Sequence, residues 1–167
     1  MNHHLRRLAG ICLLTTALLA SCSNRTELAD SVAGLTFSTL DGEQIAVAGR
    51  SRPLLINFWS TTCFICLTEM PEIAQLYRDY VDQGVQVIAV AMPYDPPNEV
   101  LELTRARQYP FPVGLDIKGE AVAAFGSIKG TPTSFLLDAE GRLVKRYVGA
   151  IKFDDLREEL DKLLEVS

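Results

Sequence analysis

Two cysteines, Cys63 and Cys66, stand two residues apart, directly after the apolar run 53–59 and at the start of a segment with helical spacing. Such a pair can form a structural disulfide, bind a metal ion or exchange electrons. A strand that leads straight into a helix places Cys63 near the helix N-terminus, where unpaired N–H groups and the helix dipole stabilise negative charge. A thiolate at such a position has a lowered pKa and is the nucleophile of thiol–disulfide exchange.

The spacing favours the redox interpretation over the other two. A disulfide that closes so short a loop contributes little chain-entropy stabilisation. Zinc sites usually need four Cys, His or carboxylate ligands, and the only histidines, His3 and His4, lie in a segment that we expect to be removed. Cu(I) bound by two thiolates stays open. Without histidine, the mature chain cannot use Ser-His-Asp or Cys-His catalysis.

The N-terminus has the features of an export signal. Arg6 and Arg7 precede an apolar run that is too short to span a membrane comfortably. The sequence Leu-Ala-Ser before Cys22 resembles the bacterial lipoprotein box. We therefore predict a signal peptide over residues 1–21, lipidation of Cys22, a polar tether over 22–34 and one domain over 35–167. An ordinary signal peptide with a chance cysteine, or an uncleaved anchor, remains an alternative.

Composition limits the possible partners. The 167 residues, 48% of them hydrophobic, are enough for one globular domain, and the net charge is -5. Without residues 1–21, 14 basic residues face 21 acidic ones, a net charge of -7. Charges of both signs are mixed along the chain and no basic patch is present, so nucleic acid is not an expected partner.

Periodicity and turn residues predict an α/β fold. We expect a mixed central sheet flanked by helices, because strands alternate with helices first and a strand hairpin follows. The expected elements are an N-terminal β-hairpin over 35–47, strands over 52–59, 85–92 and 111–116, helices over 64–83, 98–108 and 119–126, a strand hairpin over 133–149 and an amphipathic helix over 153–165.

A family resemblance rests on several motifs in order. These are Asn57-Phe58-Trp59, the pattern C-x-x-C-x-x-E-x-P that includes Glu69 and Pro71, and Gly130-Thr131-Pro132-Thr133 with Phe135. From about Leu35 to the C-terminus the chain resembles the TlpA/ResA-like thiol–disulfide oxidoreductases of the thioredoxin superfamily. The resemblance implies a thioredoxin-like fold.

The resemblance also implies roles for individual residues. Cys63 would attack a substrate disulfide and Cys66 would resolve the mixed disulfide. Pro132 matches the family's cis-proline, and Thr131 before it would offer backbone groups to the substrate. The alternative for Pro132 is an ordinary proline at the start of a strand.

Two further residues carry a functional and a structural interpretation. Glu69, half-buried on the helical face of Cys66, would exchange protons with the thiols; alternatively it is a solvated acid that complements the helix dipole. Trp59 would pack beside the site and contact substrate, or it is a core tryptophan. Thr62 stands where most relatives have Trp, and Phe64-Ile65 where many have a proline, which leaves the redox poise open.

The function expected from these features is extracytoplasmic reduction of disulfide-bearing proteins by an enzyme anchored in the lipid bilayer. A membrane electron donor would recycle it, no bound cofactor or metal is needed, and cytochrome c maturation is a plausible use. Ser23 in place of a retention Asp indicates outer-membrane sorting. The alternatives are a thiol peroxidase, although Ile56 stands where peroxidases have Pro, a Sco-type copper chaperone, although its histidine is missing, and a non-catalytic binding lipoprotein.

Overall fold

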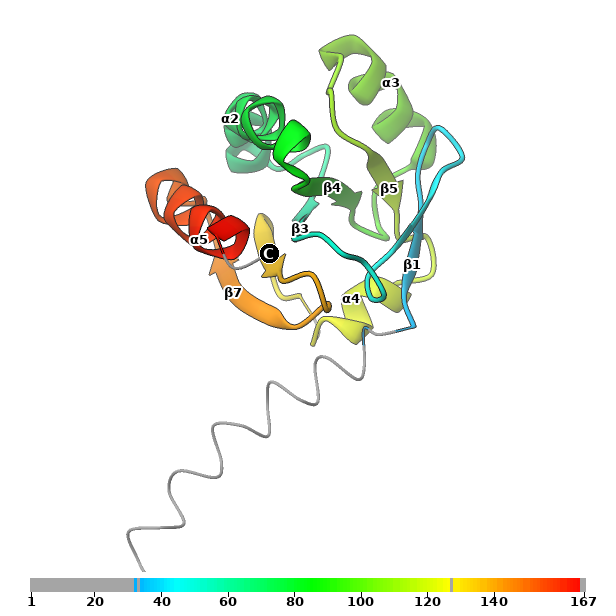
Figure 1. Ribbon diagram of the computed structural model, residues 1–167. Helices are drawn as coiled ribbons and strands as arrows, with labels where there is room; N and C mark the ends of the chain where they lie inside the picture. The colour runs from blue at the N-terminus through cyan, green and yellow to red at the C-terminus, as the bar shows by residue number, and fades with distance from the viewer. Residues whose placement is uncertain (1–31, 33, 127, 166–167) are drawn as a thin grey trace, which may run out of the picture.

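A five-stranded mixed sheet forms the centre of the protein (Figure 1). The computed structural model describes residues 32, 34–126 and 128–165. Strand order across the sheet is β5-β4-β3-β6-β7, and β1 and β2 form a separate two-stranded sheet. The elements are β1 Thr36–Ser38, β2 Gln44–Ala46, β3 Leu54–Trp59, α2 Phe64–Tyr80, the 3-10 turn Val81–Gln83, β4 Gln86–Ala91, α3 Pro97–Arg107, β5 Val113–Leu115, α4 Glu120–Ala124, β6 Thr133–Leu137, β7 Leu143–Val148 and α5 Phe153–Glu165.

Strand β3 lies in the middle of this sheet, and all six of its residues are buried. It pairs in parallel with β4 and antiparallel with β6, while β4–β5 is parallel and β6–β7 antiparallel. A strand covered on both faces has no polar face, which explains the continuous apolar run. The predicted mixed sheet is confirmed.

Helices cover the two faces of the sheet unequally. One core cluster joins alternate sheet residues, such as Leu55 and Val87, to buried side chains of α2, α3 and α5, including Ile73, Val100 and Leu156. The other cluster joins the remaining sheet residues to α4 and the N-terminal hairpin. In Figure 1, α2 and α5 accordingly lie side by side, away from α4 and β1.

The N-terminal hairpin packs against the β5 edge of the sheet. Strands β1 and β2 pair antiparallel around the Asp41-Gly42 turn, as predicted, and Gly42 has a φ of 83°, which glycine adopts without a steric cost. The Leu40 N–H donates to the Val113 carbonyl at 2.8 Å. The hairpin thereby covers part of an edge that would otherwise present unpaired backbone groups.

The carboxyl ends of β3 and β4 lie together, and the residues with chemistry follow them. The Met92 N–H donates to the Trp59 carbonyl at 3.0 Å, just beyond the last paired residues. Thr133, which opens β6, pairs with Phe58, so the chain before it reaches the same edge of the sheet. In the part of the chain that is described, no helix combines the length and the apolar character needed to cross a bilayer.

Candidate redox site

Cys63 and Cys66 form a disulfide at the start of α2, with their Cα atoms 5.2 Å apart. Cys63 is the N-cap residue, and its Sγ accepts a hydrogen bond of 3.1 Å from the Cys66 N–H. Cys63 is partly exposed, whereas Cys66 is fully buried. A donor aimed at the Cys63 sulfur stabilises negative charge there, and only this sulfur is within reach of another protein.

The two residues between the cysteines are exposed and apolar. Phe64 is 81% exposed and Ile65 is 51% exposed, an unusual state for large hydrophobic side chains. They flank the accessible sulfur. The surface around Cys63 is therefore suited to contact with an apolar stretch of a polypeptide.

Glu69 lies in α2 three residues after Cys66. Only 7% of it is exposed, so it is a buried carboxylate and not the half-buried group that the sequence led us to expect. Its Oε1 accepts from Asn57 Nδ2 and its Oε2 from the Ile151 N–H, each at 3.1 Å. Burial raises the pKa of Glu69 above its usual value of 4.5, and the two hydrogen bonds oppose part of that rise. This burial argues against the alternative of a solvated acid.

Trp59 and Pro132 frame the site in different ways. Trp59 has no exposed surface and belongs to the same core cluster as Cys66 and Met70. Its burial fits the core-tryptophan alternative and not a direct contact with substrate. The Thr131–Pro132 peptide bond is cis, as the resemblance implied, and Thr131 is partly exposed at the edge of the sheet where the cysteines lie.

A buried aspartate, Asp95, holds the turn that precedes Cys63, and the sequence analysis missed it. Asp95 lies in the loop after β4, and its carboxylate accepts hydrogen bonds from Ser60 Oγ at 2.8 Å and from the Thr61 N–H at 3.0 Å. A signal was available. The strands expected over 52–59 and 85–92 are joined by a helix, as parallel neighbours are, and parallel pairing brings the loops after both strands to one edge of the sheet.

Not every predicted residue can be placed. Cys22, the signal peptide and nearly all of the tether lie outside the described residues.

Within the described residues, no group of three or more His, Cys, Asp or Glu side chains is arranged to hold a metal ion.

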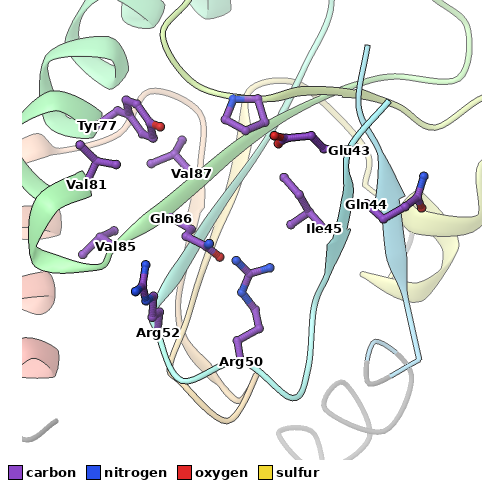
Figure 2. A pocket seen from close by; sticks show the side chains of 11 residues that line it. Glu43, Gln44, Ile45, Arg50, Arg52, Tyr77, Val81, Val85, Gln86 and Val87 are labelled. Atoms are coloured by element: carbon purple, nitrogen blue, oxygen red, sulfur yellow. The ribbon is translucent and has the colours of Figure 1, made fainter. Parts of the chain in front are cut away.

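A cavity of about 490 Å³ lies where β3 and β4 begin, at the other end of these strands from the cysteines. Figure 2 shows the side chains that line it. Its lining includes Arg50 and Arg52, which precede β3, and Tyr77 from the end of α2. Neither cysteine lines it. The redox site itself lies at the protein surface, since Cys63 is partly exposed and its neighbour Phe64 is exposed.

Comparison with known proteins agrees with this geometry. The profile of the AhpC/TSA family matches residues 29–146. The chain belongs to this family. It is 30% identical to the thiol-disulfide oxidoreductase ResA of Bacillus cereus over 146 residues, which cover 86% of this chain and 82% of that protein.

Solved structures agree as well. A Neisseria meningitidis protein, provisionally described as a thioredoxin, aligns with a TM-score of 0.75 at 32% identity, over 82% of this chain and 91% of that one. The crystal structure of StoA from Bacillus subtilis aligns with a TM-score of 0.67 at 27% identity, over 74% and 93%. The chain is a thiol–disulfide oxidoreductase with a thioredoxin-like fold.

Proposed function

We propose that this protein reduces disulfides of other proteins outside the cytoplasm while a lipidated Cys22 holds it at a membrane. The observation that carries the redox role is the difference between the two sulfurs, since Cys63 is accessible at the helix N-terminus and Cys66 is buried behind it. An accessible sulfur can attack, and a buried neighbour can resolve without meeting substrate.

The reaction runs in two exchanges. The Cys63 thiolate attacks one sulfur of a substrate disulfide, which forms a mixed disulfide and releases the first substrate thiolate. The Cys66 thiolate then attacks Cys63 Sγ, which releases the second substrate thiolate and leaves the Cys63–Cys66 disulfide. Two electrons pass to the substrate. A membrane electron donor returns the pair to the dithiol.

Glu69 and Thr131 support these exchanges. Because its pKa is raised by burial, the Glu69 carboxyl holds a proton at higher pH than an exposed glutamate does. It takes up the proton that the Cys66 thiol loses before it attacks, through water or directly. Thr131, before the cis peptide bond, offers backbone groups to an extended substrate segment beside Cys63. Reduction of apocytochromes c is a fitting task.

Cellular placement depends on the first part of the chain. Residues 1–21 act as a signal peptide, Cys22 carries the lipid and residues 22–34 form the tether of the domain 35–167. Several acyl chains anchor a protein stably where a single chain does not. Ser23 fits sorting to the outer membrane.

Peroxide reduction by the Cys63 thiolate is the second candidate. Ile56 and Ser60 stand at the offsets where thiol peroxidases hold peroxide. Ile56 is apolar and buried in β3, and Ser60 Oγ donates its hydrogen to Asp95. Neither group is free to polarise a peroxide, so disulfide exchange is favoured over peroxide reduction. Peroxide consumption by the reduced protein distinguishes the two.

The deciding experiment is to equilibrate the purified protein with glutathione or dithiothreitol and to measure its reduction potential. We expect a value near the ~-270 mV of thioredoxin or below it, as for a reductase. A value near the ~-120 mV of DsbA reverses the proposed direction of electron flow. Cys63→Ser abolishes insulin reduction and Cys66→Ser accumulates mixed disulfides; full activity in either variant contradicts the two-cysteine mechanism.

A further inference from the structure

The Asp95 carboxylate lies at the centre of a hydrogen-bonded turn that the mechanism above does not use. Only 7% of Asp95 is exposed. Its Oδ1 accepts from Ser60 Oγ at 2.8 Å and from Thr61 Oγ1 at 3.3 Å, and its Oδ2 accepts from the Thr61 N–H at 3.0 Å. Both carboxylate oxygens are thus bonded to the segment between β3 and α2.

The same bonds continue to Cys63. Ser60 Oγ has one hydrogen, which it donates to Asp95, so it accepts from the Thr62 N–H at 3.3 Å and from Thr62 Oγ1 at 3.1 Å. The Cys63 N–H donates to the Ser60 carbonyl at 3.1 Å. Asp95 therefore fixes the residue whose carbonyl holds the backbone of the exposed cysteine.

Asp95 is itself held in place from β4. Its N–H donates to the Met92 carbonyl at 3.0 Å, and the Met92 N–H donates to the Trp59 carbonyl. The turn before Cys63 is consequently tied to the end of the neighbouring strand. A fixed carboxylate loses little freedom when it accepts these bonds, so they are effective in holding the turn.

We infer that Asp95 is a positioning residue of the redox pair, which keeps the Ser60–Thr62 turn in the shape that brings Cys63 Sγ within bonding reach of Cys66. The inference deepens the proposed function and rests on it for the catalytic role of Cys63. Two sulfurs held close react as if at high local concentration, and a small displacement lowers that advantage steeply.

Replacement of the Asp95 carboxylate should change the redox equilibrium of the cysteine pair for two reasons. Loss of the carboxylate lets the turn loosen, so the disulfide is favoured less over the dithiol. It also removes a buried negative charge near the N-terminus of α2, which favours the thiolate and so again the reduced state. Both effects shift the equilibrium protein dithiol + glutathione disulfide ⇌ protein disulfide + two glutathione toward the dithiol.

The test compares Asp95→Ala and Asp95→Asn with Asp116→Asn in the full chain. Asp116 is an equally buried carboxylate that accepts from the Ala121 and Val122 N–H groups at the start of α4, away from the turn. We expect Asp95→Ala to lower the equilibrium constant for oxidation about tenfold, which corresponds to about 30 mV. kcat/KM for insulin reduction also falls at least tenfold.

Asp95→Asn has a smaller effect because its Oδ1 still accepts from Ser60, while its amide group opposes the Thr61 N–H. Asp116→Asn lowers the free energy of unfolding but leaves the equilibrium constant within twofold. Ser60→Ala, a smaller change that preserves Asp95, shifts the constant in the same direction and keeps the inference testable if Asp95→Ala does not fold.

An equilibrium constant within twofold of the wild-type value in folded Asp95→Asn and Ser60→Ala overturns the inference. So does an equal shift in Asp116→Asn, because the effect is then general loss of stability. The measurement needs no protein substrate. An inactive wild-type protein with a shifted constant in the variants counts against the proposed function and not against the role of Asp95.

Discussion

The two sulfurs of the site differ in access although they are one helical turn apart. Cys63 is the N-cap of α2 and faces solvent in part, and Cys66 points into the core cluster that contains Trp59. The N-cap position matters because its side chain accepts a backbone N–H that would otherwise have no partner. The residue that caps the helix is thus also the one whose negative charge the helix stabilises.

Glu69 should make stability depend on pH in a specific direction. Its pKa is raised in the folded state, so its contribution to the free energy of unfolding is complete below the unfolded value of about 4.5 and is lost as the pH rises through the folded pKa. The free energy of unfolding of Glu69→Gln, relative to that of the wild type, should therefore increase as the pH rises from 4 to 7, by at most about 1.4 kcal/mol per pH unit. Urea unfolding of the oxidised proteins across this range measures it.

Glu102→Gln is the control, since Glu102 is an exposed glutamate of another helix, α3, and is not among the groups that shift the pKa of Glu69. It should leave the pH dependence of unfolding nearly parallel to the wild type. The rate at which the reduced protein reacts with iodoacetamide should also change its pH profile in Glu69→Gln. Identical profiles in Glu69→Gln and the wild type would show that Glu69 exchanges no proton with the thiols.

Sequence reasoning found the reacting residues but not the partners that adjust them. The cysteine spacing and Glu69 are local patterns. The Ile151 N–H that holds Glu69 comes from 82 residues along the chain, and Asp95 lies 35 residues from Ser60. Such contacts are made by tertiary packing, and a propensity or a spacing carries no direct sign of them. Trp59 shows the same limit, because its place in the sequence shortly before the cysteines does not tell whether its side chain is exposed.

At the scale of helices and strands, alternation and turn chemistry predicted the order of the elements along the chain, the mixed sheet and the two hairpins, whereas the strand order β5-β4-β3-β6-β7 is known only from the structure. Predicted and observed bounds differ by one to three residues at the ends of both helices and strands. For example, α3 begins at Pro97 instead of residue 98 and ends at Arg107, because Gln108 adopts a left-handed conformation with a φ of 52°. A proline is well suited to the first turn of a helix, where its missing N–H has no partner to lose.

Helix α5 should be a main source of stability, because it covers the face of the sheet on which α2 lies. Leu156 and Leu160 are fully buried, as their spacing predicted. Leu156→Ala should lower the free energy of unfolding by about 2–5 kcal/mol, since a buried leucine leaves a cavity. Guanidinium unfolding measures the loss. Ile117→Ala is the control, because Ile117 is 67% exposed and its change should stay within about 0.5 kcal/mol. If Leu156→Ala lowers the free energy of unfolding as little as Ile117→Ala does, α5 does not pack as described.

At the scale of the whole molecule, the fold separates the redox surface from the rest of the chain. The cysteines, Asp95 and Thr131 gather where β3 and β4 end, whereas the cavity beside Arg50 lies where these strands begin. An exposed site bordered by Phe64 can meet a folded or extended partner without a lid. The arrangement suits an enzyme whose substrates are other proteins.

Membrane attachment should depend on Cys22 and on no residue of the domain. Cys22→Ala removes the proposed site of lipidation, so the protein should leave the membrane fraction of a bacterial host while its specific activity in insulin reduction stays within twofold of the wild type. Cell fractionation measures this, and globomycin-treated cells serve as a further comparison. Cys12→Ala, inside the proposed signal peptide, is the matched control and should keep the protein on the membrane. If Cys22→Ala stays in the membrane fraction as fully as Cys12→Ala does, an uncleaved N-terminal anchor replaces the lipid. The redox mechanism stands in either case, because it uses Cys63 and Cys66 alone.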